Sequence, residues 1–167
     1  MEKMEKKSAM EPVTVDNALR VERSELGTNV PAALFRLVRL VAFEEILGRG
    51  AAGPAYIAGK RLGKALGLPD VSAFLKLCED LNIGKIRVPK QDERSLYVDV
   101  YECVTCAGLT PVGRKLCSFE GGLIAGVMES IAKKPVTATE VTCIGGLGHK
   151  TCGFDVQIGE TTKLRAV

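Results

Sequence analysis

Cysteine residues carry the sharpest chemical signal in this sequence of 167 residues, which contains six of them. Cys143 and Cys152 flank the glycine-rich stretch 143-CIGGLGHKTC-152, and Cys117 lies farther upstream. A thiolate is a good ligand for zinc, and a closed zinc site needs four donors at about 2.0–2.3 Å. The sequence therefore indicates a metal site to which Cys117, Cys143 and Cys152 contribute three of four donors.

The fourth donor has two candidates. Glu140 lies three residues before Cys143, but strict alternation in a strand places Glu140 on the opposite face from Cys143, so a bulge would be needed. Cys103 or Cys106, in 103-CVTC-106, is the alternative fourth ligand. The same two cysteines also suit a redox pair or, with Cys117 and one further cysteine, an iron–sulfur cluster. Cys78 falls on the apolar face of a predicted helix, where we expect a buried structural thiol.

Composition narrows the class of protein. A hydrophobic content of 46% and a charged content of 26% are those of a single globular domain. The net charge of +3 is too small to indicate a nucleic-acid partner. Arg36 and Arg39 interrupt the most apolar stretch, and the N-terminus has no signal peptide, so we expect no membrane association. A cytoplasmic, reducing compartment is expected, where cysteines favour metal or redox chemistry over structural bridges.

Hydrophobic spacing predicts the elements that position these donors. The helical period recurs in four segments, and period-two alternation in four others. This order predicts an α+β fold: an antiparallel four-stranded sheet made of two hairpins, with helices packed on one face. We expect flexible tails at 1–15 and 161–167 around one domain at 16–160. The predicted helices are 31–47, 54–67, 69–84 and 114–133, and the predicted strands are 85–90, 96–103, 136–143 and 151–158.

Two further details follow from the predicted elements. Cys117 falls in the first turns of the helix at 114–133, which should pack against the end of the last hairpin, where Cys143 and Cys152 lie. Pro89 indicates that its strand is at a sheet edge. Paired glycines four residues apart permit close helix contacts within or between subunits; these pairs are Gly59/Gly63 and Gly122/Gly126.

The motifs 56-YIAGKRLG-63, 117-CSFEGGLIAG-126, 140-EVTC-143 and 152-CGF-154 resemble the 4-vinyl reductase domain family over about residues 25–160. The resemblance implies a small-molecule-binding domain with a fold like that of vesicle-transport-particle subunits and haem nitric-oxide sensors. Similar domains that sense phenols hold a zinc with a helix cysteine, a strand glutamate and two cysteines around the next turn. The matching residues here are Cys117, Glu140, Cys143 and Cys152.

One departure concerns the ligand. The phenol sensors place a histidine and a tryptophan in their pocket, whereas this chain has no tryptophan, and its one histidine, His149, lies in the turn after Cys143. The resemblance therefore does not carry phenol over as the ligand.

The sequence thus predicts a domain that binds or senses a hydrophobic small molecule in a cavity between helices and sheet, with a structural zinc. We expect it to report through a homodimer or a separate effector protein. The alternative is a reductase or thiol-redox enzyme of the 4-vinyl reductase type that uses the Cys103/Cys106 pair, although no nicotinamide or flavin signature supports it. The sequence favours a binding protein over an enzyme and leaves the question open.

Overall fold

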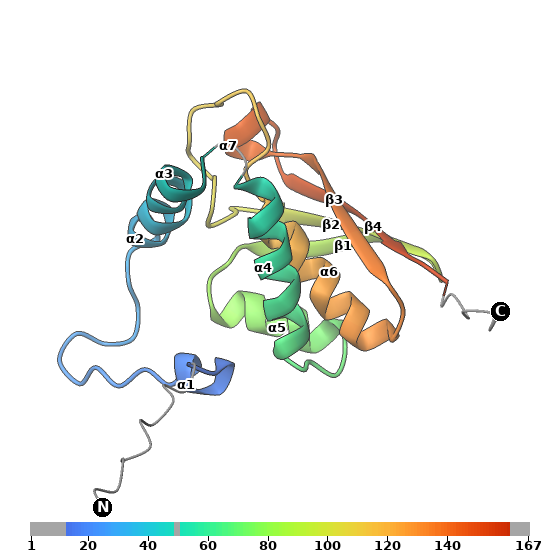
Figure 1. The fold of residues 1–167 in the computed structure, drawn as a ribbon, viewed down its shortest axis with the longest axis horizontal. Coiled ribbons are helices and arrows are strands. Elements are labelled where there is room, and N and C mark those ends of the chain that lie inside the picture. Colours follow the sequence, from blue (N-terminus) through green and yellow to red (C-terminus); the bar gives the residue numbers. More distant parts are fainter. Residues whose placement is uncertain (1–12, 49–50, 161–167) are drawn as a thin grey trace, which may run out of the picture.

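A computed structural model of the protein describes residues 13–48 and 51–160. Its helices and strands follow one another in the predicted order (Figure 1). The helices are α1 (Val15–Leu19), α2 (Ala32–Arg36), a π-helical stretch (Leu37–Ala42), α3 (Phe43–Leu47), α4 (Ala52–Ala65), α5 (Val71–Asp80), α6 (Ser118–Ala132) and α7 (Ile144–Leu147). The strands are β1 (Lys85–Gln91), β2 (Ser95–Tyr101), β3 (Val136–Thr142) and β4 (Cys152–Ile158). We call the continuous helical segment 32–47 the N-terminal helix.

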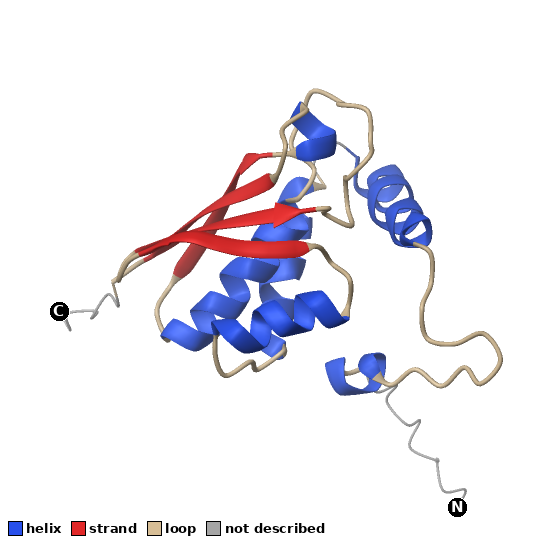
Figure 2. Ribbon diagram, turned by 180° about the vertical axis from the view of Figure 1, so that it is seen from behind, coloured by secondary structure: helices blue, strands red, loops and turns tan. Residues whose placement is uncertain are grey.

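The four strands form one antiparallel sheet in the order β1-β2-β4-β3, which confirms the two predicted hairpins. β1 is an edge strand, as Pro89 indicated, and its pairing with β2 shifts register between Arg87 and Lys90. Figure 2 shows the sheet with the helices α4, α5 and α6 gathered on one side of it. The α+β fold class is therefore the predicted one.

Helix α6 is the central element of the core. It packs directly on β3 and β4, and α4 packs on its other side. The two helices approach closely through glycines: a Cβ at Gly122 would clash with the carbonyl of Tyr56, and a Cβ at Gly126 with that of Lys60. The predicted glycine pairs thus serve a contact within one chain.

Polar side chains fasten α4 to the edge strand β3. The Ala138 N–H donates to the Tyr56 hydroxyl at 3.1 Å, and Lys60 Nζ donates to the Val136 carbonyl at 2.7 Å. Lys60 also forms an ion pair with Glu129 of α6, which Lys64 joins. Partial burial of Glu129 opposes its ionisation, but the two lysines prevail and lower its pKa to about 2. These contacts cover backbone groups that an exposed edge would leave unpaired.

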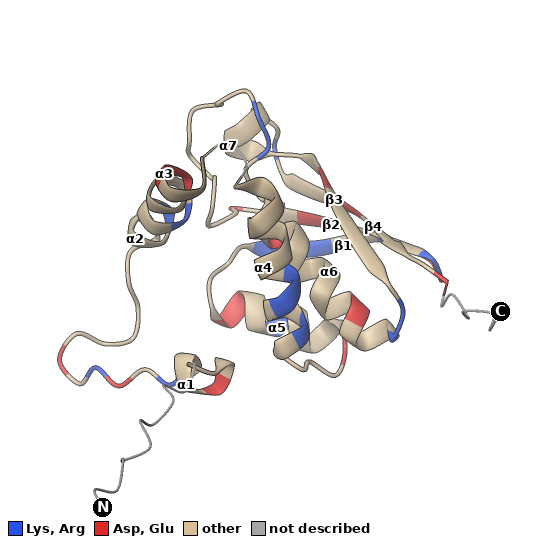
Figure 3. Ribbon diagram, in the orientation of Figure 1, with Lys and Arg blue, Asp and Glu red and all other residues tan. Residues whose placement is uncertain are grey.

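Charged residues are otherwise spread over the helices and strands (Figure 3). In the part of the chain that the structure describes, no helix has both the length and the apolar character required to cross a bilayer.

Element boundaries differ from prediction mainly at α6. The helix begins at Ser118, so Cys117 is its N-cap and residues 114–117 belong to the preceding loop. Gly113, with φ +78°, turns the chain just before this loop. At α5 the predicted cap is confirmed, because Asp70 accepts a hydrogen bond from the Ala73 N–H at 2.8 Å.

The predicted tails fall mostly outside the described residues, which exclude 1–12 and 161–167. Helix α1 buries none of its residues, and the segment 20–31 is exposed along its length. The compact part of the chain therefore begins with the N-terminal helix, while the domain limits at 16 and 160 stay a prediction.

The α4–α6 contact predicts a steric effect of single methyl groups. Gly122→Ala or Gly126→Ala should lower the free energy of unfolding by about 1–3 kcal/mol or more, because the methyl group meets backbone that cannot rotate away. Gly53→Ala in α4 is the matched control, since no atom lies within 4 Å of its Cβ position. The control should be neutral or stabilising by up to about 1 kcal/mol. Urea denaturation followed by circular dichroism measures both, and equal stability of Gly122→Ala and wild type would contradict the packing.

Candidate functional site

Five of the six cysteines converge at one end of the sheet. Cys103 and Cys106 lie in the loop after β2, Cys117 precedes α6, Cys143 follows β3, and Cys152 begins β4. Each of the five is at most 1% exposed. The structure therefore brings together in space all the thiols that the sequence singled out, while Cys78 is buried separately in α5.

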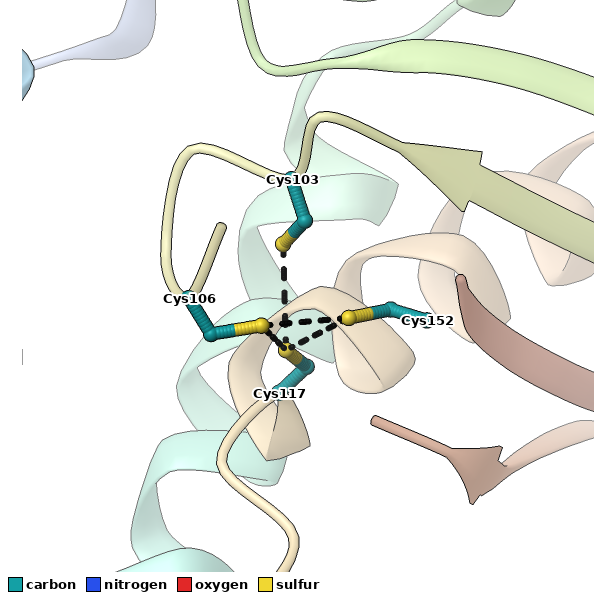
Figure 4. A group of neighbouring side chains, drawn as sticks. All are labelled: Cys103, Cys106, Cys117 and Cys152. Carbon is teal, nitrogen blue, oxygen red and sulfur yellow. Dashed lines mark hydrogen bonds between the residues drawn. The ribbon is translucent and has the colours of Figure 1, made fainter. Parts of the chain in front are cut away.

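The sulfur atoms have the spacing of a mononuclear metal site. The Cys117 Sγ lies 3.8 Å from Cys103 Sγ, 3.6 Å from Cys106 Sγ and 3.7 Å from Cys152 Sγ (Figure 4). A tetrahedral ion with metal–sulfur bonds of about 2.3 Å separates its ligands by about 3.8 Å. Cys106 Sγ and Cys152 Sγ are closer, at 3.1 Å. An iron–sulfur cluster would attach each thiolate to a different iron atom, so these direct sulfur contacts fit a single ion better.

The candidate donors form two groups of four. In each group, the potential ligand atoms all lie within 4.8 Å of one another. One group is the set that the family resemblance implied, and the other joins the alternative ligands Cys103 and Cys106 to two members of the first. The groups are Cys117, Glu140, Cys143, Cys152 and Cys103, Cys106, Cys117, Cys152.

A strand irregularity brings Glu140 into the site. Glu140 is buried on the same face as Ala138, whereas Val141 is exposed. The pairing of β3 with β4 shifts register between Glu140 and Thr142, and Cys143 is then buried as well. The expectation that regular alternation would point Val141 inward and Glu140 outward is therefore wrong, because the bulge lets residues three apart face the same side.

The Glu140 carboxyl group lacks a partner that a cation would supply. Its Oε2 accepts a hydrogen bond from the Cys117 N–H at 2.9 Å, but its buried Oε1 has no partner among the described residues. Burial, together with the nearby Cys143 thiol, raises the pKa of Glu140 to about 8. A bound divalent ion would satisfy Oε1 and favour the carboxylate, so this residue fits a metal ligand.

The contacts among the thiols also shift their pKa values. Hydrogen bonds from Cys106 and Cys117 lower the pKa of Cys103, and the same neighbours leave Cys117 with a raised pKa. Cys78 has no such partners, and burial alone raises its pKa to about 12. The cluster can therefore share a few negative charges without a metal, whereas a metal ion would allow every thiol to ionise.

Glycines in the stretch that joins β3 to β4 let the neighbouring loops pack against it. A Cβ at Gly145 would clash with the carbonyl of Cys106, and a Cβ at Gly146 with that of Arg114. The exposed His149 turns its Nδ1 back to accept from the Cys143 N–H at 3.3 Å. His149 thus supports the backbone of a candidate ligand from the predicted exposed turn position.

The cysteine loop also holds the N-terminal helix, which sequence reasoning missed. Arg36 donates from Nε to the Val104 carbonyl and from Nη2 to the Ala107 carbonyl, both at 2.7 Å. A second connection joins Glu44 of α3 to Arg114, three residues before Cys117. The signal available in the sequence was the pair of arginines within an otherwise apolar helix.

An apolar cavity of about 370 Å³ lies beneath the N-terminal helix. We predicted a cavity between helices and sheet, and this position is wrong: its lining comes from helices and the turn before α4, because α6 packs directly on the sheet. The lining residues are Phe35, Val38, Arg39, Phe43, Leu47, Ala51, Pro54, Ala55, Ala58 and Phe119.

Arg39 is the charged residue of the cavity. Its guanidinium lies 5.4 Å from the centre of the Phe119 ring, and its buried Nε has no hydrogen-bond partner among the described residues. The neighbouring Glu120 accepts a hydrogen bond from Thr105 of the cysteine loop. Burial raises the pKa of Glu120, against the opposing effects of Thr105 and Arg39. Sequence reasoning missed this buried polar group between cavity and cluster, because Glu120 falls within an otherwise apolar helical pattern.

Comparisons with known proteins agree with this architecture. The vinyl-4-reductase domain matches residues 96–158. The protein MJ1642 of Methanocaldococcus jannaschii is 32% identical over 139 residues, which cover 83% of this chain and 84% of that protein.

Two solved structures share the fold. A vinyl-4-reductase family protein from Methanocaldococcus jannaschii superimposes with a TM-score of 0.63 at 19% identity, covering 81% of this chain and 85% of that one. The phenol-responsive sensory domain of the transcription activator PoxR, solved with phenol, gives a TM-score of 0.59 at 13% identity and covers 77% and 75%. The cysteine and glycine motifs, the fold and these matches agree, and the chain belongs to the vinyl-4-reductase domain family.

Proposed function

We propose that this protein is a sensor domain that binds a hydrophobic small molecule in the cavity under the N-terminal helix. A structural zinc held by Cys117, Glu140, Cys143 and Cys152 stabilises the loops that keep this helix in place. The observation that carries the proposal is the pair of hydrogen bonds from Arg36 to the loop of Cys103 and Cys106.

These hydrogen bonds connect two features that are otherwise separate. The cavity is closed on one side by the N-terminal helix, and Arg36 fixes that helix to carbonyls directly beside the thiol cluster. The Arg114–Glu44 ion pair fixes its other end to the loop that leads to Cys117. Order in the cluster is therefore transmitted to the cavity wall, and ligand binding under the helix is in turn transmitted to the cluster.

The cavity indicates the chemistry of the ligand. Its volume of about 370 Å³ lies within the range of small-molecule sites, and its lining is apolar except for Arg39. A buried Nε donor without a partner among the described residues favours a ligand that brings an acceptor oxygen. We infer an apolar molecule with one acidic or hydroxyl group. The binding of phenol by the structurally similar PoxR domain supports this class of ligand without specifying it.

Zinc suits the proposed set because its four protein donors leave no open coordination position. Such a site contributes to folding and does not activate water. The chain's own residues then have positional tasks: Cys117 fixes the start of α6, Glu140 and Cys143 fix the end of β3, and Cys152 fixes the start of β4.

A thiol-redox enzyme that uses Cys103 and Cys106 receives less support. The two side chains are 1% and 0% exposed, and each contacts Cys117 within the larger cluster. A catalytic redox pair needs an attacking thiolate that its partner can reach. The burial of both thiols favours a structural role for the pair.

The outer face of the N-terminal helix supports a homodimer. Large apolar side chains at Leu34, Leu37, Val41 and Ile46 are all more than half exposed. A contiguous apolar patch on a soluble domain is typical of an interaction surface. We infer that a second copy of the chain covers it, and that the dimer or an effector protein bound to it reports ligand occupancy.

The dimer predicts a change in molecular mass in solution. Wild type should elute as a dimer, and Leu37→Lys with Val41→Lys should yield a monomer, because two buried ammonium groups cannot be accommodated without partners. Size-exclusion chromatography with light scattering measures this. Leu26→Lys, an exposed apolar position outside the helix, is the control and should remain dimeric. A monomeric wild type at micromolar concentration would refute this part of the proposal.

The cavity predicts selective effects on two matched probes, decanol and decanoate. Ala55→Phe should weaken the binding of both by about tenfold or more, because the ring fills the space. Arg39→Leu should weaken decanoate more than decanol, because it removes the donor. Isothermal titration calorimetry measures the affinities, with Ala65→Phe at an exposed position of the same helix as control. If Ala55→Phe binds both probes like wild type, the ligand site lies elsewhere.

The connection between cluster and cavity predicts that metal removal weakens ligand binding. Treatment with a zinc chelator should lower decanoate affinity by about tenfold, as the loop that holds Arg36 loosens. Arg36→Gln should produce a similar loss while the metal stays bound, since it removes charged hydrogen bonds of about 1.5–3 kcal/mol each. Arg61→Gln on exposed α4 should change neither quantity. Unchanged affinity in both the chelated protein and Arg36→Gln would show that the cavity is independent of the cluster.

A further inference from the structure

The thiol cluster contains more donors than one zinc ion can use. Five cysteines and Glu140 make up two groups of four that share Cys117 and Cys152. A tetrahedral ion in either group leaves two potential ligands of the other group buried and unused. With the ion among Cys103, Cys106 and the shared pair, the unused donors include Glu140 Oε1, which has no partner among the described residues.

The geometry is that of two tetrahedra with a common edge. The shared pair, Cys117 Sγ and Cys152 Sγ, are 3.7 Å apart, which matches the edge of about 3.8 Å expected for tetrahedral metal–thiolate bonds of about 2.3 Å. Cys103 and Cys106 reach this edge from the loop after β2, while Glu140 and Cys143 reach it from the end of β3. The two terminal pairs therefore come from different elements.

We propose that the cluster binds two divalent ions of the zinc class, bridged by the thiolates of Cys117 and Cys152. Cys103 and Cys106 are the terminal ligands of the first ion, and Glu140 and Cys143 are those of the second. The proposal rests on the metal site of the proposed function and adds to it a second ion with its own ligands. Each thiol that becomes a ligand releases its proton to solvent.

Charge favours two ions over one. Five thiolates and one carboxylate together carry six negative charges, of which two divalent ions balance four and a single ion only two. Uncompensated charge in a buried site is costly, so a single ion would require several of the thiols to stay protonated beside bound thiolates. Two ions let every donor take part, including the buried Oε1 atom of Glu140.

The second ion would also explain how the cysteine loop keeps its shape. Val104 and Ala107, whose carbonyls hold Arg36, lie between and directly after Cys103 and Cys106. An ion on these two thiolates ties that loop to the start of α6 through Cys117 and to β4 through Cys152. The ion at Glu140 and Cys143 contacts the cavity wall only through the bridging residues.

The test is a metal count on the full chain, with matched variants. Native mass spectrometry of the apo-protein reconstituted with Zn²⁺ should show two ions per chain. Removing either terminal pair, in Cys103→Ser/Cys106→Ser or in Glu140→Gln/Cys143→Ser, should reduce the count to one. Cys78→Ser removes a buried thiol outside the cluster and should retain two. Circular dichroism shows whether each variant is folded.

A second measurement needs only wild type. Titration with Co²⁺ should produce thiolate-to-cobalt absorption up to two equivalents, with a paramagnetic resonance signal that falls as the second equivalent binds, because bridging thiolates couple the two spins. A stoichiometry of one, with a signal that persists, would overturn the second ion and leave the single structural zinc standing. Binding of no ion would overturn both. Iron with acid-labile sulfide in the purified protein would overturn the two-ion centre in favour of an iron–sulfur cluster.

Discussion

The contact between the sulfur atoms of Cys117 and Cys152 is the constraint on which the rest of the site depends. It joins the first residue before α6 to the first residue of β4, 3.7 Å apart in the interior. Around it the chain has to bring three loops close together, and it does so with glycines at 145 and 146 that leave room for the neighbouring backbone. Buried thiols in such contact are poor hydrogen-bond partners for one another, so the arrangement is best stabilised by a metal ion.

The same end of the molecule determines how the cavity is closed. The N-terminal helix makes few contacts with the core apart from the cavity lining, and many of its apolar side chains remain exposed. Its position depends on directional polar contacts, from Arg36 to the cysteine loop and from Glu44 to Arg114. A helix held by a few polar contacts over an apolar space can move at modest energetic cost, which is the property that a ligand-sensing element requires.

Much of the architecture was accessible from local sequence signals. The two hairpins, the Asp70 cap, the edge position of Pro89 and the close helix contact at the glycine pairs follow from periodicity and backbone chemistry. The start of α6 was placed too early because apolar spacing continues through Leu116, whereas Gly113 turns the chain and Cys117 caps the helix. The cavity was misplaced because helical periodicity does not tell which helix lies directly on the sheet.

The sequence by itself determined which residue types are available for chemistry: cysteines near the ends of predicted elements, and one glutamate three positions before a cysteine. Only the tertiary structure decided that Cys103 and Cys106 join the same cluster as Glu140, and that Arg36 connects it to the cavity. The physical reason is that these contacts depend on a strand bulge and on loops whose course is set by packing at long range. Periodicity specifies which side of a regular element a residue occupies, but it carries no information about where irregular backbone brings two distant segments together.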